Sequence, residues 1–131
     1  MTSDSLGRRL ALDGVRAALD AAAGKDADEA LPHLREAADR LTGLIDESMA
    51  EAVLMGRASL RSAGVRAGLS ENAVGPRLAR TQTLGAYAND DGRVTAAAVE
   101  RAKYDHEVGS PRPAPASKPQ PMRFKPRRPT T

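Results

Sequence analysis

The chain has no cysteine and no tryptophan, and its 131 residues include only two tyrosines and one phenylalanine. Without cysteine it has no disulfide framework, no thiol nucleophile and no cysteine-ligated zinc or iron–sulfur site. Two histidines are too few for a histidine-rich metal site, so we expect no metal and no other cofactor. No apolar run approaches the roughly 18 residues of a membrane span, and the N-terminus lacks the basic-then-apolar pattern of a signal peptide. We therefore expect a soluble, cytoplasmic protein with no membrane partner.

Charge is unevenly distributed along the chain. Lysine and arginine number 20 against 17 acidic residues, and 16 of the 20 are arginine. Residues 1–57 carry a net charge of −4, residues 58–108 of +1 and residues 109–131 of +6. Such asymmetry is typical of a basic interaction arm beside a folded part. The abundance of arginine, and of alanine with 25 residues, is typical of GC-rich bacterial genomes.

Residues 109–131 do not have the composition of a folded element. Seven prolines lie in this stretch, and each removes a backbone donor and fixes φ, so we expect a disordered, partly polyproline-II tail. Three interpretations stay open: a solubilising end, an arm that binds nucleic acid without sequence preference, or a docking motif for a protein partner. The cationic cluster that would act in the last two consists of Arg123, Phe124, Lys125, Arg127 and Arg128.

The first part, residues 4–57, has the pattern of two helices joined as a hairpin. Apolar residues at helical spacing predict a first helix that begins at one of the N-terminal serines and ends at Gly24. An aspartate after Gly24 would cap a second helix, in which Pro32 is tolerable only in the first turn. The predicted inner face of the first helix consists of Leu6, Leu10, Val15, Leu19 and Ala22.

The second helix carries the clearest periodicity in the chain. Its apolar positions alternate spacings of three and four residues, and this 3.5-residue repeat is typical of the seam of a coiled coil or helix hairpin. Two compatible interpretations stay open: the seam packs on the first helix of the same chain, or it pairs with a second copy in a homodimer. The seam consists of Leu31, Leu34, Ala38, Leu41, Ile45, Ser48, Ala52 and Met55.

The most informative segment covers residues 59–87. It predicts a short helix over 59–67, a tight turn and a second helix from about Ser70, a residue type that caps helix N-termini well. Gly68 stands at the turn, where a sharp corner between helices needs a positive φ that glycine adopts without a Cβ penalty.

Three further residues support this helical corner. Gly64 lies four residues before the turn glycine, where a small side chain lets two helices approach closely. Leu69 would point into the core between the helices, and Val74 would pack back on the first one. On these residues, the segment 59–80 resembles the helix-turn-helix DNA-binding family, of the kind found in small bacterial, in particular actinobacterial, regulators.

The resemblance implies a partner and a set of contacts. In that family the second helix lies in the major groove of double-stranded DNA, and residues near its N-terminus touch base edges. Carried onto this chain, base contacts fall on Ser70, Glu71, Asn72, Ala73 and Arg77, with Gly75 at a further position of this kind. Phosphate contacts, which position the protein without reading sequence, fall on Arg57, Arg61, Arg66, Arg80 and Arg93.

Two residues depart from the family pattern. Pro76 removes a backbone donor inside the second helix, which predicts a kink or a later start near Val74. Arg77 stands where the family usually carries an apolar residue, and Leu78 would take that place in a shifted register. The segment is also compatible with an ordinary helical corner in a small bundle, because alanine-rich chains readily produce Ala-Gly-Leu-Ser.

An Asp-Gly turn signal separates this segment from the C-terminal part of the fold. We expect a plain loop over residues 84–94, with a small β-hairpin wing that carries Arg93 near its tip as the alternative. Thr95 then caps a helix through about Glu107. The apolar face of this helix, which would close the core, consists of Ala98, Val99, Ala102 and Tyr104.

The sequence thus predicts an all-α protein, a small helical bundle in three segments: a helical hairpin (4–57), a helix-turn-helix domain with a closing helix (58–108) and a disordered, basic, proline-rich tail (109–131). No glycine-rich phosphate loop or Ser/His/Asp set is present, so we do not expect an enzyme. The expected function is sequence-specific DNA binding by a nucleoid-associated transcriptional regulator. The alternatives are a helical adaptor protein with a C-terminal docking motif, or a nonspecific nucleoid-type DNA binder.

Overall fold

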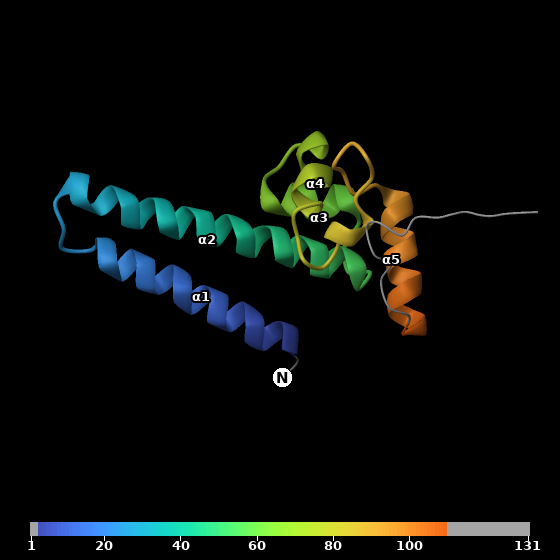
Figure 1. The fold of residues 1–131 in the computed structure, drawn as a ribbon, viewed down its shortest axis with the longest axis horizontal. Coiled ribbons are helices and arrows are strands. Elements are labelled where there is room, and N and C mark those ends of the chain that lie inside the picture. The colour runs from blue at the N-terminus through green and yellow to red at the C-terminus, as the bar shows by residue number, and fades with distance from the viewer. Residues whose placement is uncertain (1–2, 110–131) are drawn as a thin grey trace, which may run out of the picture. The chain divides into compact units, whose positions relative to one another are not determined.

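The computed structural model describes residues 3–109, and these residues are helical with no β-strand (Figure 1). This confirms the all-α fold class. The predicted tail and its cationic cluster lie outside the described residues, apart from Gly109. The elements in chain order are α1 (Ser3–Ala22), α2 (Ala27–Leu54), α3 (Leu60–Ala67), α4 (Glu71–Leu78), the 3-10 helix η1 (Gly85–Tyr87) and α5 (Ala96–Val108).

The described residues divide between Met49 and Ala50 into two compact units. The division falls within α2, so the last turn of this long helix belongs to the second unit. The hairpin and the helix-turn-helix segment expected from the sequence fall largely in the first and second units, respectively. Among residues 3–109, no helix combines the length and the apolar character that crossing a bilayer requires.

The first unit is a hairpin of α1 and the greater part of α2. Gly24 ends the first helix in the left-handed conformation, with φ of +82°, as expected from its position. The acidic side chains of Asp28 and Glu29 lie in the first turn of α2, where they complement the positive end of the helix dipole. Pro32 is the sixth residue of α2, so the expectation that it lies in the first turn is wrong. There it leaves only the carbonyl of Asp28 without its helical donor, close to the helix start.

Small side chains make the core of this hairpin. Val15 and Ala18 of α1 form a buried cluster with Ala37 of α2, and Ala22 and Ala30 are buried near the connection. Alanine at these positions lets two helices approach closely, and it contributes little apolar area to their stability.

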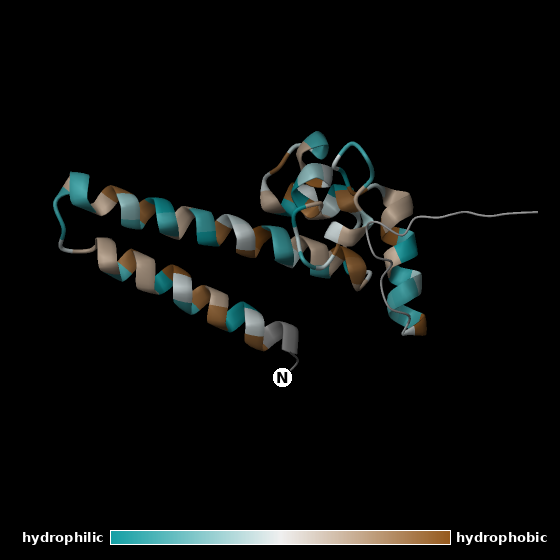
Figure 2. Ribbon diagram, viewed as in Figure 1, coloured by the Kyte–Doolittle hydropathy of each residue, from teal (hydrophilic) through white to brown (hydrophobic). Residues whose placement is uncertain are grey.

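The predicted inner faces are only partly covered. Val15 and Ala22 are buried as expected, but the three leucines predicted beside them on α1 are 48–62% exposed: Leu6, Leu10 and Leu19. The seam residues of α2 likewise do not pack on α1. The alanines that directly precede seam residues in the sequence make that contact instead. Three seam leucines are consequently 43–62% exposed: Leu31, Leu34 and Leu41. Apolar segments recur along both helices in the hydropathy colouring (Figure 2).

The second unit has a larger core. Its biggest fully buried side chains are Val53 from the last turn of α2, Val74 and Leu78 from α4, and Leu84 before η1. The predicted closing helix is confirmed as α5, and its N-cap Thr95 accepts a hydrogen bond through its side chain from the backbone of Ala98. The buried face of α5 consists of Ala98, Val99 and Ala102. Tyr104 is 64% exposed, so its placement on that face is wrong.

Candidate nucleic-acid interface

Helix α3 has defined signals at both of its ends. At the start, Ser59 and Ser62 form a capping box: the Ser62 N–H donates to Ser59 Oγ at 3.0 Å, and the Ser59 N–H donates to Ser62 Oγ at 2.9 Å. At the end, Gly68 adopts φ of +75°. The Leu69 N–H then donates to the Gly64 carbonyl at 2.8 Å, as in a Schellman turn. The tight turn predicted at Gly68 is therefore confirmed.

The corner between α3 and α4 depends on one close approach. A Cβ atom placed on Gly64 would lie 2.6 Å from Cγ2 of Val74, which is closer than two carbon atoms can approach. Val74 is 2% exposed, and Gly64 is buried as well. The predicted packing of Val74 against α3 is thus confirmed, and a larger residue at position 64 would force Val74 or the two helices to shift.

Helix α4 begins where the turn ends, before its proline. Its N-cap is Ser70, with extended backbone angles and no hydrogen bond from its side chain. The helix starts at Glu71 and continues through Pro76 to Leu78, so a start near Val74 is wrong. Pro76 is the sixth residue of α4, and the carbonyl that it deprives of a helical donor belongs to Asn72, in the first turn.

Arg93 donates a hydrogen bond to the carbonyl of Asn72. Nη2 of Arg93 donates to the backbone oxygen of Asn72 at 3.2 Å, and the N–H of Val94 donates to the carbonyl of Gly75 at 3.1 Å. Gly75 is buried against this segment, since a Cβ atom there would lie 3.3 Å from the Val94 oxygen. Gly75 is therefore not available to touch a base. Arg93, predicted as a phosphate contact, is half-buried and holds the loop onto α4.

The loop before Arg93 is tight and contains no strand. The side-chain oxygen of Asn89 accepts hydrogen bonds from the N–H groups of Asp91 and Arg93 at 2.9 and 3.1 Å. The N–H of Asn89 donates in turn to the carbonyl of Arg93 at 2.9 Å, and Gly92 takes φ of +76°. The loop expectation for residues 84–94 is confirmed, apart from the single turn of η1, and no wing is formed by these residues.

The remaining predicted base contacts differ in exposure. Ser70, Glu71 and Asn72 are exposed at the N-terminus of α4, next to one another along the chain. Ala73 is half-buried. Arg77 is also half-buried and already interacts with another group in the protein. The surface that α4 offers to a ligand is therefore its N-terminal turn.

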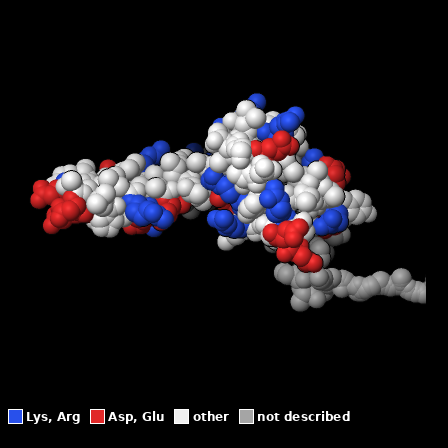
Figure 3. Space-filling view, turned by 90° about the horizontal axis from the view of Figure 1, so that it is seen from above, with Lys and Arg blue, Asp and Glu red and all other residues white. Residues whose placement is uncertain are grey.

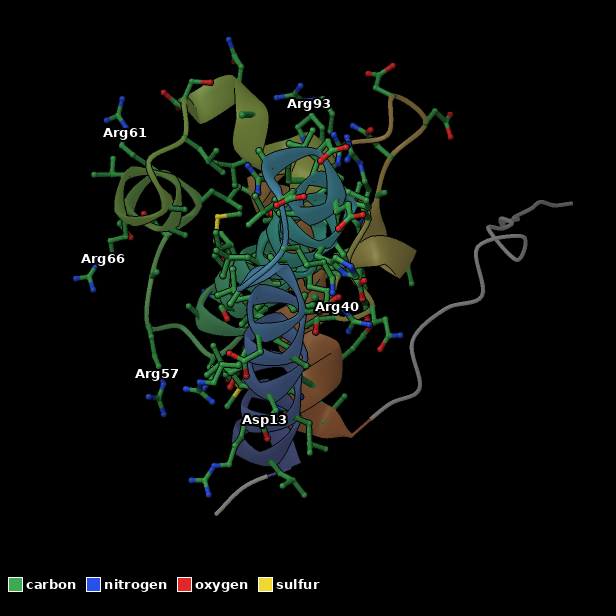
Figure 4. All side chains as sticks on the ribbon, turned by 90° about the vertical axis from the view of Figure 1, so that its left-hand side faces the viewer. Asp13, Arg40, Arg57, Arg61, Arg66 and Arg93 are labelled. Carbon is green, nitrogen blue, oxygen red and sulfur yellow. The ribbon has the colours of Figure 1, made fainter. Side chains whose placement is uncertain are left out.

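The predicted phosphate contacts other than Arg93 are all exposed. Figure 4 shows Arg57, Arg61 and Arg66 pointing outward along one side of the second unit. Arg61 lies close to the N-terminus of α4, because its Nη2 is 3.5 Å from Oε1 of Glu71. Both side chains of this ion pair are more than 70% exposed, so water screens it and it adds little to stability. Arg80 follows α4 at its other end. Basic and acidic groups alternate over the face of this unit seen in Figure 3.

Two polar contacts of the second unit, one buried and one partly buried, were not expected from the sequence. Thr81 is 5% exposed; its Oγ1 donates to the carbonyl of Leu78 at 2.6 Å and accepts from the N–H of Leu84 at 3.1 Å. The hydroxyl of the buried Tyr87 donates to Oδ2 of Asp105 at 2.6 Å and joins η1 to α5. The only indication of the second contact in the sequence was a single tyrosine within a predicted loop.

Comparison with models of known protein families found no match. The same holds for comparison with curated proteins and for comparison with solved structures. Within residues 3–109, no three His, Cys, Asp or Glu side chains are grouped so as to hold a metal ion.

Proposed function

We propose that this protein binds double-stranded DNA sequence-specifically, as a transcriptional regulator, with the N-terminal turn of α4 in the major groove. The observation that carries the proposal is the α3–α4 corner. The close approach of Gly64 to Val74 and the left-handed Gly68 fix two short helices in a corner that leaves the first turn of α4 exposed. A helix-turn-helix presents its recognition helix in this way.

The chemistry of that turn suits base edges. The exposed side-chain amide of Asn72 can pair with adenine, and the carboxylate of Glu71 can accept a hydrogen bond from the amino group of cytosine. Arg93 leaves the Asn72 side chain free for this role, because it binds the backbone carbonyl of that residue.

The charge around the turn supports the same proposal. The exposed arginines Arg57, Arg61, Arg66 and Arg80 lie in or next to α3 and α4, and Glu71 is the only acidic residue from 57 to 80. Arginine at such positions neutralises phosphates and releases counterions, which supplies affinity without specificity.

The test is selection of bound duplexes from a randomised pool by the full chain at about 150 mM salt, a concentration at which nonspecific binding is weak. A second full-chain protein, in which Arg123, Lys125, Arg127 and Arg128 are changed to Gln, removes the contribution of the C-terminal charges. We expect both proteins to enrich the same motif.

Two single variants then locate the contact. We expect Asn72→Ala to weaken binding to the selected duplex by about tenfold, since a lost base contact costs roughly 1–3 kcal/mol. Glu71→Ala should relax the preference at one base pair. Glu100→Ala is the matched control, because Glu100 is equally exposed and also forms a 3.5 Å ion pair, on α5. If no motif is enriched and binding disappears with the C-terminal charges, the proposal fails in favour of a nonspecific DNA binder.

A further inference from the structure

One flank of the α1–α2 hairpin is an uncovered apolar surface. Four leucines on it are 43–62% exposed, and Ile45, half-buried, continues the row. We call this surface the leucine face, and it consists of Leu19 on α1 and Leu31, Leu34, Leu41 and Ile45 on α2.

Helix geometry places these residues on the same flank. Successive residues turn by about 100° around a helix. Viewed along α1 from its N-terminus, Leu19 lies clockwise of the buried Val15 and Ala18 around the helix axis. Viewed along α2 from its own N-terminus, Leu34 and Leu41 lie clockwise of the buried Ala37. Because the two helices run antiparallel, clockwise turns from facing inner sides lead to the same flank of the hairpin.

The other flank carries a charged pair of α2. The guanidinium of Arg40 lies over Gly14 of α1, where a Cβ atom would be 2.9 Å from Nη1 of the arginine. Its Nε donates to Oε2 of Glu36 at 2.9 Å. Figure 4 shows Arg40 on this flank of α2. The hairpin therefore carries a charged pair of α2 on one flank and a row of exposed leucines on the other.

The hairpin also has too small a core for its length. Its fully buried contacts between α1 and α2 rest on one valine and several alanines, whereas six of its leucines are exposed. A single core in a unit below about 70 residues supplies only a few kcal/mol, and association is one of the common additional sources of stability.

We propose that the leucine face binds the leucine face of a second copy of this chain, and that the two hairpins form a four-helix bundle. The spacing of three and four residues from Leu31 through Ile45 is the pattern that packs one helix into another along a seam. A two-fold interface joins the same patch on both copies, so a row of apolar side chains can pack against its own copy.

The chain outside the described residues does not fit this face. Residues 110–131 contain seven prolines, and their only large apolar side chains are Met122 and Phe124. Two large apolar side chains are too few to match a row of five. The second copy is the occupant whose pattern matches.

The first test is sedimentation equilibrium of the full chain from about 1 to 100 μM. Such a range covers dissociation constants typical of weak to moderate association. We expect twice the chain mass at the upper end. Leu34→Glu with Leu41→Glu should shift the chain to monomer at the upper end of that range, whereas Leu10→Glu should not. Leu10 is the matched control, because it is 62% exposed on the same hairpin and lies away from the leucine face.

A second test does not depend on the stability of the doubly charged variant. Because the chain has no cysteine, single-cysteine variants can be cross-linked unambiguously by a short bis-maleimide. Ala38→Cys adds a thiol between Leu34 and Leu41, and Ala17→Cys adds one at an exposed position on the opposite flank. We expect covalent dimers at least tenfold faster from Ala38→Cys. A monomeric full chain at all concentrations, or equal cross-linking of both variants, overturns the proposal and leaves DNA binding untouched.

Discussion

Nη2 of Arg93 donates a hydrogen bond of 3.2 Å to the backbone carbonyl of Asn72, the carbonyl that stands four residues before Pro76. A proline inside a helix leaves this acceptor without its usual N–H donor. The guanidinium takes the place of the missing donor and at the same time attaches the 89–94 loop to α4. An arginine with the sequence context of a surface cation therefore supports α4.

This relationship predicts a coupling between Arg93 and Pro76. We expect Arg93→Met to lower the free energy of unfolding by about 0.5–1.5 kcal/mol, the usual contribution of one hydrogen bond. In a Pro76→Ala background the loss should be smaller, because an alanine at this position supplies the N–H that the carbonyl of Asn72 lacks. Urea unfolding followed by helical circular dichroism measures all four proteins of the cycle. Equal losses in the two backgrounds would mean that Arg93 acts elsewhere.

The contact of Gly64 with Val74 predicts a steric penalty. We expect Gly64→Ala to destabilise the protein by about 1–3 kcal/mol, the typical cost of overpacking a well-packed site. Gly43→Ala is the control: it lies within α2 with no atom near the added methyl group, so it should stabilise the helix by about 0.5–1 kcal/mol. In a Val74→Ala background, where the clashing methyl group is absent, Gly64→Ala should cost little. A neutral Gly64→Ala in the unchanged chain would show that α3 and α4 are not held this closely.

The hydrogen bonds of the buried Thr81 predict that removing its hydroxyl group lowers the stability of the protein. We expect Thr81→Val to destabilise the protein by about 1–3 kcal/mol, because the buried N–H of Leu84 loses its acceptor while the side-chain volume is preserved. Thr81→Ser keeps the hydroxyl and should cost less than the valine variant. Thr42→Val, at an exposed position of α2, controls for the residue type and should change stability by only a few tenths of a kcal/mol. If the serine variant is the less stable of the two, the methyl group matters more than the hydrogen bonds.

The exposed arginines of α3 predict the salt dependence of the DNA binding that we propose. Each phosphate contact contributes about −0.9 to the slope of log K against log salt concentration. We expect Arg61→Gln with Arg66→Gln to reduce the magnitude of this slope by about 2 and to weaken binding to all duplexes alike. Arg101→Gln, an exposed arginine on α5, should leave the slope unchanged. The measurement is fluorescence anisotropy over a salt series, and an unchanged slope in the double variant would remove α3 from the interface.

The helices and their ends could be predicted from short stretches of sequence. Gly24, Gly68 and Thr95 each act within a few residues, through a positive φ or a capping hydrogen bond, and the structure has each in that role. The small residue at Gly64 and the apolar residue at Val74 were likewise recognisable, since the spacing between them belongs to one supersecondary motif.

Tertiary packing decided which helix faces are buried and which polar groups form hydrogen bonds with one another. Periodicity along α2 is the same whether the leucines or the neighbouring alanines touch α1, and only the approach of the two helices selects the alanines. A sequence likewise shows that Pro76 deprives the carbonyl of Asn72 of a donor, but not that Arg93, distant along the chain, replaces it. Local conformation depends on neighbours a few residues away, whereas burial and polar pairing depend on residues that only the folded chain brings together.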